Sequence, residues 1–383
     1  MVAIPISLYV HFPWCRHKCP YCDFNSFALT MGDEKNIDLY IKCLLADLTM
    51  AGEKYGDCEL QSIYFGGGTP SLLPPLAITK ILEGAKKYFS LAANIETTLE
   101  ANPGTVTLDL VKEFKQAGIN RFSLGVQSFN DKCLRSIGRI HDKEQALAAV
   151  WAIKSSGFTN FNLDLMFGLP GQDVDSALAD LHQALSLNPA HLSWYQLTLE
   201  SNIREFSETK FLWSHLPSSK RIWEIQCAGQ DFLSKQGYIQ YEIAAYSRLA
   251  DTKCLHNVNY WQYGDYLGIG AGAHSKVTLN DHVIKRYWQI SEPKLYMDAE
   301  NFIAGEEMVA KEKVPCEFML NALRLYQPIS YELFCARTGF TIEAIGARLQ
   351  EAQNLGLVEL SERSIITTEF GKNFLNNLLE IFL

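Results

Sequence analysis

HFPWCRHKCPYCDF, residues 11–24, is the stretch from which the fold of this chain is predicted. It places Cys15, Cys19 and Cys22 in one loop, with three and then two residues between them. Three thiolates this close in sequence indicate a metal centre. A structural zinc site takes four ligands, and the next cysteine, Cys43, lies inside a predicted helix. A site with three protein ligands leaves one coordination position open, and a 4Fe-4S cluster held by thiolates suits this best.

The rest of the first 245 residues alternates short apolar runs with longer helical patterns. Such alternation is typical of repeated βα units and a parallel sheet. The helical spacing of Ile37, Ile41 and Leu44 predicts an amphipathic helix over about residues 36–51. Six strands are predicted, at residues 7–12, 61–65, 95–100, 121–126, 160–166 and 191–197. Six parallel strands with helices outside them form an α/β fold, a curved and partly open barrel.

Polar and glycine residues follow several of these strands. The cysteine loop comes after the first strand, Gly66–Gly68 after the second, and Glu100, Gln127 and Asp164 lie near the ends of three others. Ligands of parallel α/β folds bind at the carboxyl ends of the strands. We therefore expect these residues to lie together on one rim of the barrel.

The CxxxCxxC loop after a first strand resembles the signature of the radical S-adenosylmethionine (SAM) superfamily. The resemblance implies a (β/α)6 partial TIM barrel and a 4Fe-4S cluster on Cys15, Cys19 and Cys22. It also implies that SAM chelates the remaining iron, and that an electron from the cluster cleaves SAM to a 5'-deoxyadenosyl radical. The alternative from the residues alone is a zinc knuckle or a chance cluster of buried thiols.

The motifs around the loop resemble the coproporphyrinogen dehydrogenase-like branch of that superfamily. The resemblance assigns the glycine turn to the amino group of SAM, and Arg139 is suited to pair with the SAM carboxylate. Which acid contacts which part of SAM stays open, and each polar residue alone is also consistent with a structural role. The SAM-site and cluster-side residues expected on this basis are Tyr9, Tyr21, Gly67, Gly68, Thr69, Glu100, Gln127, Arg139 and Asp164.

Two features separate the chain from the dehydrogenases of this branch and make it similar to the HemW group of heme chaperones. Phe24 stands where the dehydrogenases carry a fourth cysteine. The chain also has the HNxxYW motif of the HemW group, at His256-Asn257-Val-Asn-Tyr260-Trp261. His256 offers an imidazole to heme iron, and Tyr260 and Trp261 offer flat apolar surfaces to the macrocycle. The alternative is a structural loop in which these aromatic residues are core.

The C-terminal part has a different pattern. We expect residues 1–245 to form the radical SAM core, residues 246–310 a connecting segment that carries the heme motif, and residues 311–383 a small winged-helix-like domain. Winged helices often bind DNA, but this module has 7 Lys and Arg against 9 Glu. An interaction or covering role is therefore expected.

Composition limits the function further. With 34 Lys and Arg against 43 Asp and Glu, the net charge of -9 argues against nucleic acid as a partner. No signal peptide or transmembrane run is found, so a cytoplasmic location is expected. The predicted function is a heme chaperone that carries a SAM-liganded cluster, with heme, client hemoproteins and an electron donor as partners. The alternatives are oxygen-independent coproporphyrinogen III dehydrogenation, whose product is formed by oxidative decarboxylation, and a zinc-structured interaction protein.

Overall fold

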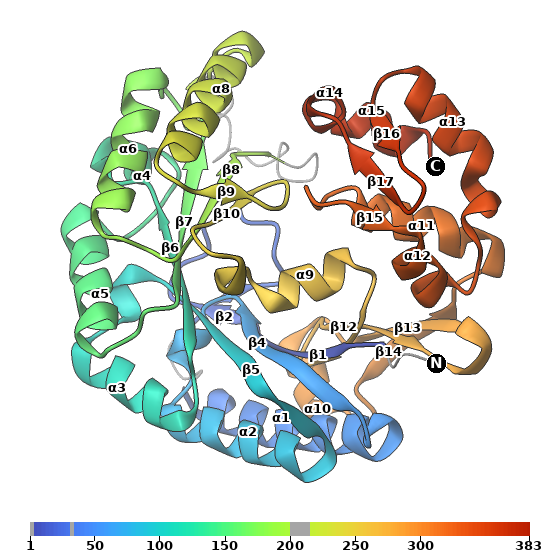
Figure 1. Cartoon of the computed structure of the whole chain (residues 1–383). Helices are drawn as coiled ribbons and strands as arrows, with labels where there is room; N and C mark the ends of the chain where they lie inside the picture. Colours follow the sequence, from blue (N-terminus) through green and yellow to red (C-terminus); the bar gives the residue numbers. More distant parts are fainter. Residues whose placement is uncertain (1–3, 31–33, 200–214) are drawn as a thin grey trace.

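The computed structural model describes residues 4–30, 34–199 and 215–383. A curved sheet of twelve strands dominates the molecule, in the order β14-β13-β12-β11-β1-β4-β5-β6-β7-β8-β10-β9 (Figure 1). Six neighbouring parallel strands form its centre and match the predicted ones. They are β1 (Ile6–Phe12), β4 (Glu59–Gly67), β5 (Ser90–Ala101), β6 (Arg121–Gln127), β7 (Phe161–Phe167) and β8 (His191–Gln196). The predicted partial barrel is therefore confirmed.

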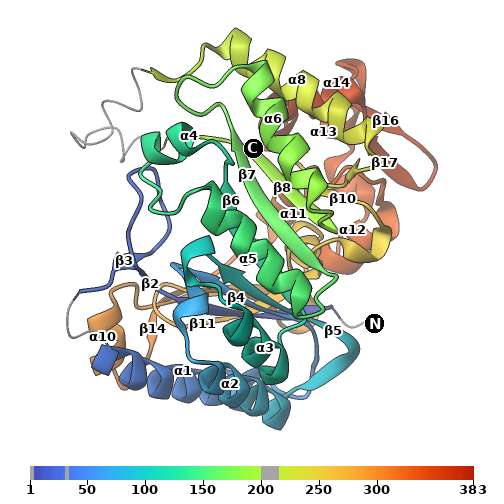
Figure 2. The same ribbon diagram turned by 90° about the vertical axis from the view of Figure 1, so that its left-hand side faces the viewer.

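Helices cover the outer face of this sheet (Figure 2). They are α1 (Glu34–Tyr55), α2 (Pro75–Tyr88), α3 (Leu108–Ala117), α4 (Asp131–Ser136), α5 (Lys143–Ser155), α6 (Val174–Ser186) and α8 (Ser219–Lys235). In α3 the Thr107 side chain accepts a hydrogen bond from the backbone N–H of Leu110, and Gly118 ends the helix in the left-handed region at φ 112°. Val111 and Phe114 are buried against the sheet. Capping and an apolar face thus fix the position of the helix.

The sheet continues beyond the predicted strands at both edges. On one side β11 (Asp265–Ile269) pairs parallel with β1 and is followed by the antiparallel strands β12 (His274–Thr278), β13 (Ile284–Gln289) and β14 (Ile303–Met308). Helix α10 (Pro293–Asp298) links the last two. The other edge holds β10 (Ala245–Ser247) and β9 (Ile239–Gln240). The segment 246–310 was expected to be a connection, but it contributes four strands to the sheet.

Helix α9 (Leu255–Trp261) lies on the concave side of the sheet, between the barrel and the C-terminal module (Figure 1). This module has helices α11 (Val314–Ala322), α12 (Tyr331–Thr338), α13 (Gly346–Asn354), α14 (Glu369–Asn373) and α15 (Leu375–Glu380). Its small sheet has the order β15 (Ile329–Ser330), β17 (Ser364–Thr367), β16 (Val358–Leu360). Three helices followed by a β-hairpin give the predicted winged-helix arrangement.

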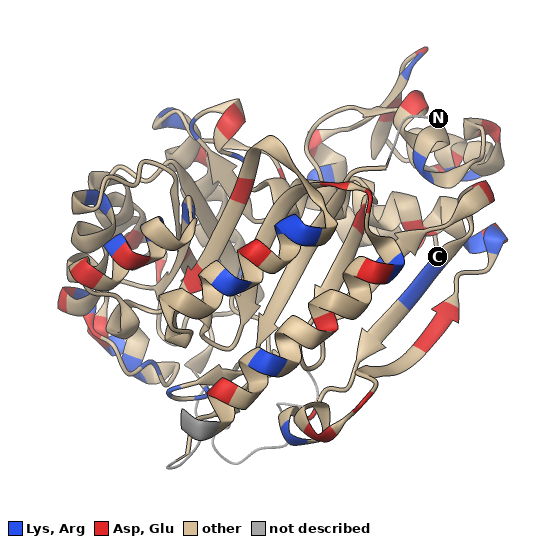
Figure 3. Ribbon diagram, turned by 90° about the horizontal axis from the view of Figure 1, so that it is seen from below, with Lys and Arg blue, Asp and Glu red and all other residues tan. Residues whose placement is uncertain are grey.

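The surface of the molecule carries charges of both signs. Basic and acidic residues are interspersed along the outer helices (Figure 3). Among the described residues, no helix combines the length and the apolar character that a membrane span requires.

Candidate functional site

The cysteine loop leaves the carboxyl end of β1 and folds back on itself. Two short parallel strands, β2 (Trp14–Cys15) and β3 (Phe27–Ala28), hold its two ends together. The backbone N–H of Phe27 donates to the carbonyl oxygen of Pro13 over 2.8 Å. The backbone N–H of Leu29 donates to the carbonyl oxygen of Cys15, also over 2.8 Å. As a result, all three cysteines line one cavity of about 570 Å³ on the concave side of the barrel.

The thiols of this cavity have the chemistry of cluster ligands. Burial, with the nearby thiols of Cys22 and Cys19, raises the pKa of Cys15 to about 11. Iron would bind the thiolate, so cluster assembly releases protons here. The Arg139 guanidinium lies 3.7 Å from Cys19 Sγ and supplies a positive charge next to the ligands.

The two kinds of metal centre place different demands on the cysteines. Zinc binds sulfur at about 2.3 Å, so its ligands must converge on one point. Over residues 4–30, 34–199 and 215–383, no three His, Cys, Asp or Glu side chains are placed to hold a metal ion in this way. A four-iron cluster is larger than one ion and needs room beside its ligands. Cys15, Cys19 and Cys22 line one cavity of about 570 Å³, which provides three thiols and space next to them.

The glycine turn is required by a contact within the protein. Gly67 has φ 120°, and a Cβ there would lie 2.7 Å from Cε1 of His11. A Cβ on Gly68 would lie 2.5 Å from the backbone oxygen of Trp14. These contacts within the protein already require glycine at both positions, independently of any ligand. The backbone of Gly67 and Gly68 and the side chain of Thr69 still line the cavity.

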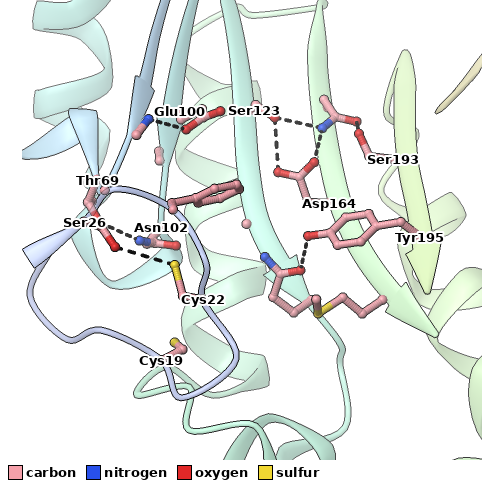
Figure 4. Close-up of a pocket in the computed structure, with 18 of the residues that line it drawn as sticks. Cys19, Cys22, Ser26, Thr69, Glu100, Asn102, Ser123, Asp164, Ser193 and Tyr195 are labelled. Atoms are coloured by element: carbon pink, nitrogen blue, oxygen red, sulfur yellow. Dashed lines mark hydrogen bonds between the residues drawn. The ribbon is translucent and has the colours of Figure 1, made fainter. Parts of the chain in front are cut away.

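Glu100 (labelled in Figure 4) and Arg139 both line this cavity. Glu100 Oε1 accepts a hydrogen bond from Tyr64 Oη over 2.8 Å, and Oε2 accepts one from Gly67 N over 3.2 Å. Burial raises the pKa of Glu100 to about 7. Arg139 Nη2 donates to Asn102 Oδ1 and to Gly125 O over 2.5 and 2.7 Å. The guanidinium is thereby fixed with its charge toward the cysteines.

Asp164 lies across the cavity from the cysteine loop (Figure 4), and Gln127 also lines the cavity. Gln127 has a left-handed backbone, φ 68°, at the end of β6, and its Oε1 accepts a hydrogen bond from Tyr195 Oη over 2.9 Å. Asp164 lies in the middle of β7, not at its end. Its carboxylate accepts hydrogen bonds from Asn162 Nδ2 over 2.7 Å and Ser123 Oγ over 3.2 Å. Burial raises the pKa of Asp164.

Sequence reasoning missed several polar residues of this cavity. They are Ser123 on β6, Asn162 on β7, and Ser193 and Tyr195 on β8. Alternation of polar and apolar residues within an otherwise apolar strand is the signal that identifies them. Tyr21 also lines the cavity, in the cysteine loop.

A second cavity of about 500 Å³ lies next to the first. Gly67, Glu100 and Phe24 line both cavities. Its other lining residues include Tyr9, His11, His256, Tyr260, Tyr266, His274 and Arg286. Tyr9 was expected beside the cluster, but it lines this cavity instead and its Oη is hydrogen-bonded to His11 Nδ1.

Helix α9 divides the HNxxYW motif between the two cavities. His256 and Tyr260 are four residues apart and line the second cavity. Asn257 and Trp261 are also four residues apart and line the first. Residues at i and i+4 share one face of a helix. Trp261 therefore lines a different cavity from His256, whereas Tyr260 shares a cavity with His256. That both rings contact the macrocycle stays a prediction.

His256 is held between aromatic rings and is neutral. Its ring centroid lies 4.8 Å from that of Tyr64 and 5.9 Å from that of Tyr9, in stacked arrangements. Burial, together with the positive charge of Arg121, lowers the pKa of His256 to about 4. Its Nδ1 atom is buried and has no hydrogen-bond partner among the described residues. The imidazole thus keeps a lone pair available at neutral pH.

Comparison with known proteins agrees with this site. The family model of the radical SAM superfamily matches residues 9–184, and that of the HemN C-terminal domain matches residues 309–373. A partial barrel with three cysteines at its rim and this family match define a radical SAM protein, a class whose members use a 4Fe-4S cluster and SAM. The chain belongs, within that class, to the HemW heme chaperone family. It is 44% identical over 380 residues to heme chaperone HemW of Escherichia coli (strain K12), which covers 99% of this chain and 98% of that protein.

More distant relatives extend the comparison. Heme chaperone HemW of Bacillus subtilis (strain 168) is 31% identical over 385 residues, covering 98% of this chain and 99% of the relative. Among solved structures, the radical SAM enzyme coproporphyrinogen III oxidase (HemN) from Escherichia coli is similar with a TM-score of 0.83 at 23% identity. The likeness covers 99% of this chain and 90% of that one, and it shows the shared fold.

Proposed function

We propose that this chain binds heme in the second cavity, with His256 as an iron ligand, and transfers it to client hemoproteins. The observation that carries the proposal is the position of His256 on α9. Its neutral imidazole and the ring of Tyr260 line a cavity that is separate from the one lined by the cysteines. An imidazole ligand beside an aromatic ring is a common setting for heme.

The first cavity supports the second part of the proposal, a 4Fe-4S cluster on Cys15, Cys19 and Cys22 with SAM beside it. When bound, these groups supply one-electron reduction and SAM cleavage, for which an electron donor is required. Arg139 carries a fixed positive charge suited to the SAM carboxylate. Glu100, Gln127 and Asp164 offer oxygen atoms to its ammonium group and ribose hydroxyls.

The test uses one anaerobically reconstituted sample of the full chain. Heme is titrated into wild type and His256→Phe, and the Soret absorbance reports ligation. Phenylalanine keeps a ring between Tyr9 and Tyr64 and removes only the nitrogen atoms. We expect heme affinity to fall at least tenfold in His256→Phe. As a control, Trp261→Phe changes the other face of α9 and leaves heme affinity close to that of wild type.

The same sample decides between the alternatives. Turnover of coproporphyrinogen III with SAM and a reductant is expected to be absent, since Phe24 replaces the fourth cysteine of the dehydrogenases. Multiple-turnover formation of protoporphyrinogen would contradict the chaperone function. Iron and zinc analysis tests the third alternative, because a zinc-structured protein yields a colourless sample without iron.

A further inference from the structure

We infer that Arg286 binds a propionate carboxylate of the tetrapyrrole in the second cavity, which makes this site selective for macrocycles with free carboxylates. The inference rests on the proposed heme function. It begins with the arrangement of the strands. Tyr266, Lys276 and Arg286 are directly opposite one another on β11, β12 and β13. Opposite residues of neighbouring strands place their side chains on the same face of a sheet.

The two cations on this face differ in their partners. Lys276 is 2% exposed and its Nζ donates to Asp265 Oδ1 over 2.8 Å and to Tyr263 O over 3.0 Å. Its charge is thus neutralised beneath the cavity, and Lys276 is not among the lining residues. Arg286 reaches the cavity. Among the residues that line it, Arg286 is the one Lys or Arg side chain.

The hydrogen bonds of Arg286 are incomplete. Its Nη2 donates to Glu317 Oε2 over 2.7 Å. Its Nε atom is buried and has no hydrogen-bond partner among the described residues. A guanidinium has five N–H donors in a planar fork, and a carboxylate accepts two of them at once. The pair with Glu317 uses one of these five donors, and Arg286 lines the cavity, so the guanidinium keeps further N–H groups for a ligand carboxylate while that pair is kept.

The other groups of the cavity make a carboxylate the expected ligand of Arg286. Burial lowers the pKa of His11, His256 and His274, so these imidazoles are neutral at pH 7. Tyr260 and Tyr266, with ring centroids 5.3 Å apart, offer aromatic surface. Aromatic rings, neutral imidazoles and one cation suit a flat apolar macrocycle that carries carboxylates at its edge. The one carboxyl side chain among the lining residues is Glu100, whose pKa burial raises to about 7.

The experiment compares heme with heme dimethyl ester, in which both carboxylates are methylated. Each is titrated anaerobically into wild type, Arg286→Gln and Arg221→Gln, with Soret absorbance as the readout. Arg221 is a matched control, because it pairs with Glu224 at 3.5 Å on α8, in another part of the molecule. We expect wild type and Arg221→Gln to bind heme roughly tenfold more tightly than the ester. In Arg286→Gln the two ligands are expected to bind equally, at the affinity that the ester has for wild type.

The outcomes separate this inference from the proposed function. Equal binding of heme and ester by wild type, or an unchanged preference in Arg286→Gln, overturns the role of Arg286 and leaves heme binding intact. Wild type that binds neither ligand overturns the proposed function and this inference together. If Arg286→Gln does not fold, Glu317→Gln replaces it. That variant removes the negative charge that competes for the guanidinium, so the preference for heme over the ester must increase, and an unchanged or smaller preference overturns the inference.

Discussion

Asp265→Ala is predicted to destabilise the protein by about 3–5 kcal/mol at pH 7, since breaking a buried ion pair leaves an uncompensated charge. Asp265 Oδ1 accepts hydrogen bonds from Lys276 Nζ and Thr278 Oγ1, and Oδ2 accepts one from Thr278 N, each over 2.8 Å. Lys276 is 2% exposed. The pair joins β11 to β12 beneath the second cavity. Its loss therefore affects the strands that carry Tyr266 and His274.

The loss of stability caused by the unpaired Lys276 charge in Asp265→Ala has an upper limit that depends on pH. Burial already lowers the pKa of Lys276, and removal of Asp265 lowers it further. The unfolded chain, with a lysine pKa of about 10.4, then binds a proton that the folded variant lacks, so stability rises with pH. Keeping this lysine neutral costs about 4.6 kcal/mol at pH 7 and about 1.9 kcal/mol at pH 9. The variant should thus regain about 2–3 kcal/mol over this interval.

Chemical denaturation at pH 7 and pH 9 measures this effect in the protein without bound cofactors. The control is Asp265→Ala combined with Lys276→Met, which removes the charge as well as its partner. The double variant should be more stable than the single variant at pH 7 and should gain less stability at pH 9. Equal losses at both pH values, or a double variant no more stable than the single one, would refute the reasoning.

Three further predictions follow from the site and the core. Gly229→Ala should lower the free energy of unfolding, measured by chemical denaturation, by about 1–3 kcal/mol. The added Cβ would lie 1.9 Å from Cη2 of the buried Trp194. Gly346→Ala is the neutral control, because a Cβ at that position meets open space. SAM affinity, measured by titration of the reconstituted cluster, should rise from pH 6 to pH 8 as Glu100 ionises at its pKa of about 7, and Glu100→Gln should flatten the profile. Arg139→Gln should weaken SAM binding roughly tenfold to a hundredfold, as expected for the loss of a charge-assisted hydrogen bond; unchanged affinity would remove Arg139 from the SAM site.

The central strands and outer helices were predictable because local patterns determine them. Thr107 and Gly118 mark the ends of α3, and its buried residues recur at helical spacing. The outer strands on the β1 side were not predictable in this way. In β11 the glycine of Tyr266-Leu-Gly268-Ile suggests a loop, but it is required because β12 approaches closely. A Cβ on Gly268 would lie 2.2 Å from the backbone oxygen of His274.

The cysteine loop and its polar neighbours could also be predicted, since ligands of parallel strands gather at one end of the sheet. The second cavity could not, because it is formed by residues far apart in the chain. Tyr9 comes from β1, His256 from α9 and Arg286 from β13. Within the motif, the i and i+4 spacing assigns His256 and Tyr260 to one cavity and Asn257 and Trp261 to the other. This assignment can be made only once residues 255–261 are known to be helical.

The boundary between the two cavities joins two stretches that lie far apart in the sequence. Phe24, two residues after Cys22, lines both cavities together with Glu100. On the same boundary, the Tyr64 hydroxyl donates to Glu100 while its ring stacks on His256 at 4.8 Å. Tyr64 therefore links the Glu100 carboxyl group, which lines both cavities, to the imidazole of His256, which lines the second. The second cavity is thus built directly against the cavity that the cysteines line.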